Sequence, residues 1–216
     1  MTSVLIVEDQ KMAQENIEAI IRSTPHYCLA GSIPNAADAE LFCMREHVDL
    51  ILMDVCTARD ENGIDATVVI KKRFPRIKII IVTSMAEHTF IEKAKQAGAD
   101  SFWYKDTSTG ELLRVMDRTM AGEHIFPGKT PEVKLGLTTS YELTPSELDV
   151  LRALMQSTSD EDAARQLSCT KANIRWHLSK ILEKTGYRTR MELLIAVARK
   201  NLIIVTPDKA LDEENF

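Results

Sequence analysis

Short apolar runs alternate with amphipathic stretches along the first 120 residues of this 216-residue chain. The runs have the length of strands, and the stretches between them repeat apolar positions with the period of a helix. We expect strands at about 3–7, 27–32, 49–54, 77–83 and 101–104. Helices are expected at about 11–23, 35–46, 63–73, 87–97 and 108–120. Because the runs are almost continuously apolar, the pattern predicts a doubly wound five-stranded parallel sheet that is buried on both faces.

The pattern changes after residue 121. Residues 122–141 lack periodicity and are rich in Gly and Pro, which indicates an interdomain linker. Beyond it, Thr144, Pro145 and Glu147 form the start signal of a helix. Four helices are expected, at about 145–156, 160–167, 171–184 and 191–199. Two short helices joined by a tight turn, with basic residues on the second, are a helix-turn-helix pattern. We predict a small all-α domain at 142–205 and a tail at 206–216.

Polar residues stand where four of the predicted strands end. Glu8 and Asp9 follow the first strand, Asp54 ends the third, Thr83 ends the fourth and Lys105 follows the fifth. Since parallel strands deliver their carboxyl ends to one edge, and open α/β sheets bind ligands there, these side chains are expected to meet. Any one of them alone is more often a helix cap or a surface residue. Together they predict a reactive carboxylate beside a metal ion.

This set of groups suits phosphoryl transfer to Asp54. The transition state spreads negative charge over three oxygens, so a cation and an ammonium group are needed to neutralise it. We expect Mg²⁺ to bind the carboxylates of Asp9 and Asp54 directly, Glu8 through water, and the backbone carbonyl of Cys56. Lys105 would meet the phosphoryl group, and Thr83 would donate its hydroxyl to it.

The charge is unevenly distributed along the chain. The net charge is −5, but residues 171–200 hold eight basic and two acidic residues, a local +6. A local basic face is the electrostatic footprint of phosphate binding, although most such runs are solvated helix faces. Four scattered cysteines argue against a zinc site or a disulfide framework. No apolar stretch reaches the length of a membrane span, and we expect a cytoplasmic protein without membrane contact.

The two halves of the chain carry motifs of one known family. The first set is Glu8-Asp9, Asp54, Thr83, Gly98–Phe102 and Lys105, and the second runs from Leu143-Thr-Pro-x-Glu147 to Arg190-Met-Glu-Leu193. The chain resembles two-component response regulators of the NarL/FixJ group. The resemblance implies a flavodoxin-like receiver at 1–121 and a LuxR-type helix-turn-helix domain. Such a protein is a transcriptional regulator and not an enzyme. A sensor histidine kinase would phosphorylate Asp54, with Thr83 and Phe102 as the switch pair, although Trp103 or Tyr104 could equally be the outward aromatic.

The same resemblance implies double-stranded DNA as a partner, bound at an inverted-repeat promoter site by a homodimer. Arg175, Trp176 and Ser179 lie opposite the apolar face of the predicted recognition helix, and Arg175 is the best candidate for reading a base. The full set of expected DNA contacts is Lys171, Asn173, Arg175, Trp176, Ser179, Lys180, Lys184, Arg188 and Arg190. Dimer contacts could use 91–105 or the last helix, where Leu193, Leu194, Val197 and 202–205 are apolar.

Some positions depart from the family pattern. Thr57-Ala58 replaces the expected Met-Pro, and Gly63 comes one residue late, which puts the lifetime of the phosphoryl group in question. Two enzyme classes share features of this pattern. A flavodoxin-like flavin or nucleotide enzyme shares the fold but needs a first loop rich in Gly, Ser and Thr, where this chain has Glu8-Asp9-Gln10-Lys11. A haloacid-dehalogenase phosphatase also uses a strand-end Asp and Mg²⁺ but needs a second Asp where Cys56 stands, so the sequence argues against both classes. The alternative that stays open is an atypical receiver that works without phosphorylation, with a helical domain that binds protein or RNA.

Overall fold

The computed structural model describes residues 1–85, 87, 89–105, 109–200 and 202–203. Its contacts divide the chain into two compact units, one formed by 1–84 and 90–128 and the other by 85–89 and 129–216. Each unit has its own apolar core, so each is described separately. Within the described residues, the longest and most apolar helices fall short of a membrane span.

The first unit is built on five parallel strands in the order β2-β1-β3-β4-β5. The strands are β1 (Thr2–Val7), β2 (Tyr27–Ile33), β3 (Leu50–Asp54), β4 (Lys78–Thr83) and β5 (Ser101–Tyr104). The helices are α1 (Lys11–Arg22), α2 (Ala39–Arg45), α3 (Gly63–Arg73), α4 (Thr89–Gln96) and α5 (Thr109–Met120), with short 3-10 turns at Ala36–Asp38 and Ala58–Asp60. The predicted doubly wound sheet is confirmed.

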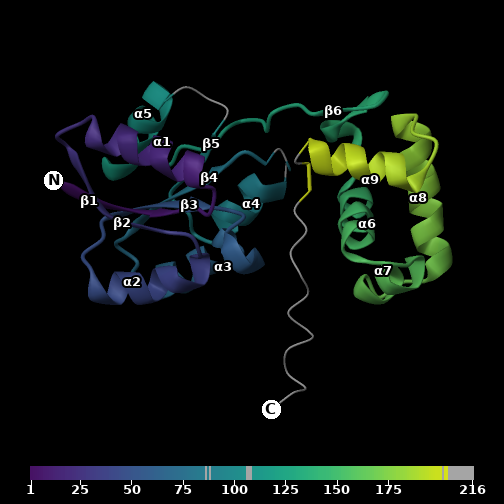
Figure 1. Cartoon of the computed structure of the whole chain (residues 1–216), viewed down its shortest axis with the longest axis horizontal. Helices are drawn as coiled ribbons and strands as arrows, with labels where there is room; N and C mark the ends of the chain where they lie inside the picture. The colour runs from purple at the N-terminus through teal and green to yellow at the C-terminus, as the bar shows by residue number, and fades with distance from the viewer. Residues whose placement is uncertain (86, 88, 106–108, 201, 204–216) are drawn as a thin grey trace, which may run out of the picture. The chain divides into compact units, whose positions relative to one another are not determined.

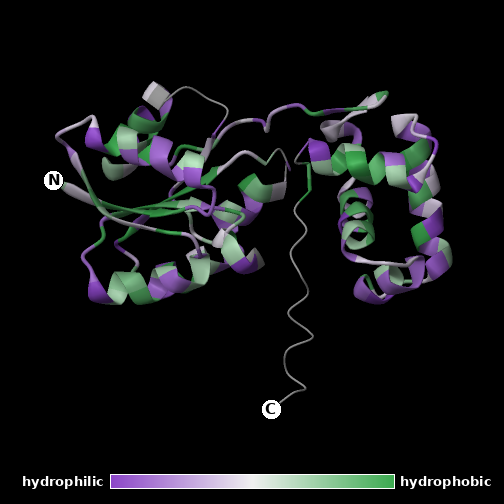
Figure 2. Cartoon of the chain, in the orientation of Figure 1, coloured by the Kyte–Doolittle hydropathy of each residue, from purple (hydrophilic) through white to green (hydrophobic). Residues whose placement is uncertain are grey.

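Helices cover both faces of this sheet, with α1 and α5 on one side and α2 and α3 on the other (Figure 1). The α1 and α5 face packs Ile17, Ile21 and Met116 against alternate strand residues such as Ile6 and Leu52. All five residues of β3 are buried. Burial on both faces explains why the central strands are apolar at almost every position, as Figure 2 shows.

The second unit has four helices among its described residues: α6 (Pro145–Gln156), α7 (Asp160–Gln166), α8 (Lys171–Thr185) and α9 (Arg190–Arg199). Thr144 and Glu147 form the predicted capping box of α6. Ser159, Thr170 and Thr189 each accept a hydrogen bond from a backbone N–H of the helix that follows. Local capping chemistry therefore sets the four starts, which is why they could be predicted from the sequence.

One element inside the predicted linker was not foreseen. Strands β6 (Lys134–Leu135) and β7 (Thr138–Thr139) form an antiparallel hairpin, followed by a 3-10 turn at Ser140–Glu142. Leu135 is fully buried in the core of the helical unit. Gly136 has φ 64°, and a Cβ there would lie 1.9 Å from the Thr185 carbonyl, so no larger residue fits. The hairpin belongs to the helical unit, and only residues that precede it can serve as linker.

Candidate functional site

The strand ends meet as the sequence predicts. Glu8 and Asp54 are 1% and 3% exposed, whereas Asp9 is exposed. Carboxylate oxygens of these three residues all lie within 4.8 Å of one another. The Nζ atom of Lys105 lies 2.9 Å from Asp54 Oδ2 and 2.5 Å from Glu8 Oε2. Three carboxyl groups thus share this edge with one ammonium group, which contacts two of them, so the acidic groups outnumber the basic one. A hard divalent cation that prefers oxygen ligands fits this donor set.

Burial dominates the electrostatics of Asp54. It raises the pKa of Asp54 to about 7, while Lys105 acts to lower that pKa and Glu8 acts to raise it. Burial acts to lower the pKa of Lys105, but the neighbouring carboxylates of Asp54 and Glu8 hold it above its usual value. Lys105 therefore remains a cation beside a carboxylate that ionises close to neutral pH. An additional cation at the site would favour the ionised, nucleophilic form of Asp54.

The loop after Asp54 accommodates its extra residue without opening. The backbones of Cys56 and Asn62 form an antiparallel bridge, and the hydroxyl of Thr57 donates to the Glu61 carbonyl at 2.8 Å. Arg59, at the tip, has φ 61°, an uncommon conformation for a side-chain-bearing residue. The bridge brings the late glycine back into place at the start of α3.

Gly63 lies directly against β3, the strand that ends in Asp54. A Cβ at this position would lie 1.9 Å from the Asp54 carbonyl oxygen, and the Gly63 N–H donates to the Val55 carbonyl at 3.0 Å. The side chain of Asp54 is held in turn by the N–H of Val55, 2.7 Å from Oδ1. The altered loop therefore keeps the carboxylate of Asp54 in a defined position.

The two residues expected to form a switch are both in the interior. Thr83 ends β4 and is fully buried. Phe102 is buried, with its ring centroid 4.9 Å from that of Tyr104, whereas Trp103 packs into the core between the sheet and α1 and α5. In this structure all three aromatic residues of β5 are buried. A switch that uses Phe102 thus requires the ring to leave its present position.

Helix α8 separates an apolar face from a polar one. Ile174 and Ile181 are buried in the core, as the pattern predicts. Asn173, Arg175, Ser179 and Lys180 are exposed. Trp176 is 59% exposed and meets His177 edge to face, with ring centroids 4.8 Å apart. Five of the nine expected DNA contacts therefore share one solvent-facing helix surface.

Other basic residues of the expected set have partners that the sequence did not reveal. Lys184 Nζ lies 2.8 Å from Oε2 of Glu147, the capping-box glutamate of α6, and donates to the Glu142 carbonyl at 3.2 Å. Lys171 pairs with Glu161. Arg188 is exposed, and its backbone N–H donates to the Glu192 carboxylate at 3.0 Å. Of these contacts, the pair of Lys171 with Glu161 could have been predicted from the cluster of acidic residues in the first turn of α7.

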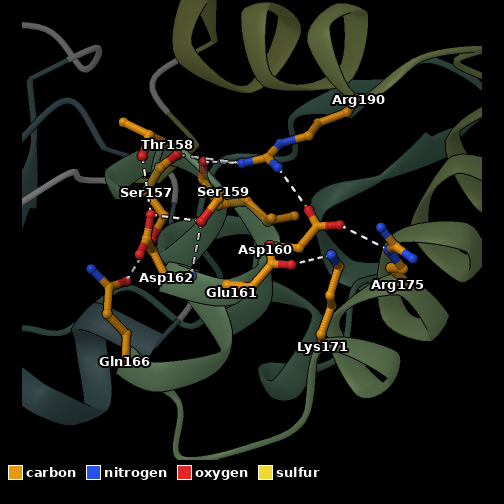
Figure 3. Close-up of polar contacts among 11 residues, drawn as sticks. Ser157, Thr158, Ser159, Asp160, Glu161, Asp162, Gln166, Lys171, Arg175 and Arg190 are labelled. Atoms are coloured by element: carbon orange, nitrogen blue, oxygen red, sulfur yellow. Dashed lines mark hydrogen bonds and ion pairs between the residues drawn. The ribbon is translucent and has the colours of Figure 1, made fainter.

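Arg190, another residue of the expected DNA-contact set, also has partners inside the helical unit, as Figure 3 shows. Arg190 Nη1 lies 2.8 Å from Asp160 Oδ1, and its Nη2 donates to the carbonyls of Leu154 and Ser157 at 3.0 and 3.4 Å. These contacts join α9 to α7 and to the end of α6. Arg190 is therefore largely engaged inside the helical unit.

The apolar surface expected on the last helix differs from the one observed. Leu193 and Val197 are fully buried in the core of the helical unit, so they offer no contact to a second copy. Leu202 and Ile203 are buried as well, and residues 204–205 lie outside the described residues. Met191 and Ile195 are the exposed large apolar residues of α9. The sequence correctly predicted a helix here, but its pattern did not show which apolar residues of α9 pack into the core and which stay exposed.

Comparisons with known proteins agree with both halves of this geometry. Residues 4–117, more than half of the chain, match the family described as response regulator receiver domain. Residues 141–197 match the family described as bacterial regulatory proteins, luxR family. The response regulator protein VraR of Staphylococcus epidermidis is 29% identical over 208 residues, which cover 93% of this chain and 98% of VraR.

Two solved structures have a similar fold. The RcsB response regulator of Salmonella typhimurium gives a TM-score of 0.54 at 16% identity and covers 92% of this chain and 98% of its own. A LuxR family DNA-binding response regulator from Silicibacter pomeroyi gives a TM-score of 0.51 at 28% identity, and the match covers 59% of this chain and 97% of that one.

Proposed function

Since this chain belongs to the response regulators that join a receiver domain to a LuxR-type helix-turn-helix domain, we propose that a partner histidine kinase phosphorylates Asp54 and so controls DNA binding. The observation that carries the acceptor assignment is the buried carboxylate of Asp54, 2.9 Å from Lys105 at the edge shared by Glu8 and Asp9. The regulator acts in the cytoplasm, where it meets chromosomal DNA.

The residues at this edge divide the work of phosphoryl transfer. Asp54 attacks the phosphorus atom of the kinase's phosphorylated histidine through one carboxylate oxygen, so that an O–P bond forms while the N–P bond breaks and the histidine nitrogen leaves. The carboxylates of Asp9 and Asp54, the carbonyl of Cys56 and, through water, Glu8 would hold Mg²⁺, which would supply charge neutralisation when bound. Lys105 pairs with the transferred phosphoryl group, which replaces part of its present contact with Asp54. The hydroxyl of Thr83 donates a hydrogen bond to the same group, and the ring of Phe102 turns into the space that the Thr83 side chain leaves.

The helical unit is proposed to read DNA with α8. The exposed face of α8 carries Arg175, Trp176, Ser179 and Lys180, and a recognition helix presents such residues to base edges in the major groove. The similar Silicibacter pomeroyi protein is described as DNA-binding. Lys171, Asn173, Lys184, Arg188 and Arg190 complete the proposed contact surface and act mainly on phosphates. Lys184 and Arg190 can contact phosphates only through N–H groups that their partners Glu147 and Asp160 do not occupy, or after leaving those partners.

The active species is proposed to be a homodimer on an inverted repeat. Met191 and Ile195 expose apolar surface on α9 where two copies can pack. Two recognition helices related by a two-fold axis require two similar half-sites. We propose a receiver domain at 1–121, as expected, and a helix-turn-helix domain whose expected range of 142–205 is extended to begin at Lys134. The extension is needed because the β6–β7 hairpin packs Leu135 into the core of the helical unit.

Two measurements test this function. Acetyl phosphate with Mg²⁺ should add one phosphoryl group that hydroxylamine removes, and Asp54→Asn should abolish the labelling. Lys105→Ala should retain Mg²⁺ binding but slow the labelling. The full chain should bind a selected DNA duplex more tightly after phosphorylation, whereas the fragment 129–216 should bind it regardless of acetyl phosphate. Labelling that persists in the Asp54→Asn variant would exclude Asp54 as the acceptor.

A second candidate function rests on Trp176. An exposed tryptophan flanked by polar residues is also typical of a surface that binds a protein or RNA. In that function the receiver works without phosphorylation. DNA binding that is insensitive to salt and to Arg175→Ala would favour it.

A further inference from the structure

We infer that Asp160 is a positioning residue for DNA reading, which holds Arg175 in one orientation for recognition of a guanine. This inference rests on the proposed DNA-binding function. It concerns how the sequence is read, since Asp160 itself would touch no base.

The carboxylate of Asp160 lies between two arginines from different helices (Figure 3). Its Oδ2 accepts from Arg175 Nε at 3.1 Å, and its Oδ1 accepts from Arg190 Nη1 at 2.8 Å. Asp160 is the first residue of α7, Arg190 is the first residue of α9, and Arg175 lies in the second turn of α8. One carboxylate therefore connects the recognition helix to both of its neighbours.

Asp160 and Arg190 are held in place within the helical unit, whereas the guanidinium group of Arg175 is exposed to solvent, where DNA can reach it. Asp160 is 18% exposed, and Arg190 is held by the two carbonyls at the end of α6. Arg175, in contrast, is 63% exposed. Within the described residues, Arg175 contacts Asp160 through Nε, so the N–H groups of Nη1 and Nη2 remain available to donate to a base. The acid thus restrains the stem of Arg175 and leaves its outer edge available.

The available edge matches one base. Guanine presents O6 and N7 in the major groove, and an arginine recognises both with two parallel N–H donors. A long side chain that is already restrained loses less freedom when it forms these bonds. Restraint also disfavours the rotamers that would let Arg175 reach a phosphate or a different base. Arg175 is thereby directed to selectivity instead of general affinity.

The acid has a matching disadvantage for general DNA affinity. A carboxylate close to the groove repels phosphates, so a surface selected for affinity alone would lack it. The neighbouring acid Glu161 pairs with Lys171 and leaves Arg175 untouched. The two acids share a helix turn and a charge, but only Asp160 contacts the predicted base-reading residue. They form a matched pair for experiment.

The experiment uses the full chain, treated with acetyl phosphate and Mg²⁺, and a pool of randomised DNA duplexes. Wild type should enrich duplexes with a guanine at one position of each half-site. Asp160→Asn should lower the preference for that guanine about tenfold, or about 1.4 kcal/mol, without weakening the binding of unrelated duplexes. The control Glu161→Gln should raise affinity for all duplexes alike and leave the preference unchanged.

A double-mutant cycle separates positioning from folding. In an Arg175→Ala background, Asp160→Asn should cause no further loss of affinity for the selected duplex, because the residue it positions is absent. If Asp160→Asn lowers affinity by the same factor with and without Arg175, its role is structural and the inference is wrong. Unchanged guanine preference in Asp160→Asn would also overturn it. A wild type that binds duplexes without selecting any sequence would overturn it as well, whereas a wild type that binds no duplex would overturn the DNA-binding function itself.

Discussion

Replacing Asp54 by Asn should stabilise the metal-free receiver, and the gain should grow with pH. The pKa of Asp54 is raised from 3.8 to about 7 by burial, so the folded state disfavours its carboxylate. In wild type, the stability associated with protonated Asp54 is fully present below the unfolded pKa and is lost as pH rises through about 7. Asparagine cannot ionise and carries no such loss.

The size of the effect follows from the two pKa values. Each pKa unit corresponds to about 1.4 kcal/mol, so the carboxylate destabilises the folded receiver by about 4 kcal/mol at pH 8 and about 2 kcal/mol at pH 5. The loss of the ion pair with Lys105 offsets part of this in the variant. We expect Asp54→Asn to be the more stable protein at pH 8, with a gap that narrows toward pH 5.

The assay is urea unfolding in the presence of EDTA, followed by the fluorescence of Trp103, which is buried in the receiver core. A Trp176→Phe background removes the other tryptophan of the chain. The control Glu15→Gln removes an exposed carboxylate of α1 and should leave the gap from wild type small at each pH. Adding Mg²⁺ should stabilise wild type more than Asp54→Asn. A gap that does not change with pH, or a wild type more stable than the variant at pH 8, would refute the reasoning.

Three further outcomes are expected. Gly63→Ala should slow labelling by acetyl phosphate at least about tenfold, because the added Cβ would displace the Asp54 carbonyl. The control Gly110→Ala has open space around its Cβ and should be labelled at the wild-type rate in the same mass assay. Lys184→Ala should destabilise the helical unit by about 1–3 kcal/mol in thermal unfolding, because it leaves the buried carboxylate of Glu147 without its cation. The control Lys180→Ala should change the unfolding midpoint little, and equal midpoints for the two variants would contradict the prediction. DNA affinity should fall linearly with salt on a logarithmic plot as cations of α8 release counterions, and a flat plot would point to a protein partner.

Features that depend on neighbouring residues could be predicted from the sequence. The strands and helices of the receiver follow from apolar periodicity, and the helix starts of the second unit follow from caps such as Thr144 and Thr170. The edge that gathers Glu8, Asp54 and Lys105 follows from parallel connectivity, which sends every strand end to the same side. These rules need only the order of residues along the chain.

Features that depend on which distant groups meet were decided by the tertiary structure alone. The β6–β7 hairpin has strands too short to show a period, and it forms because Leu135 enters the core and Gly136 approaches Thr185. Likewise, composition marks Lys184 and Arg190 as basic but cannot show their carboxylate partners. A charged side chain reaches several possible partners on an unfolded chain, and only the packed arrangement of helices brings one of them within hydrogen-bond distance.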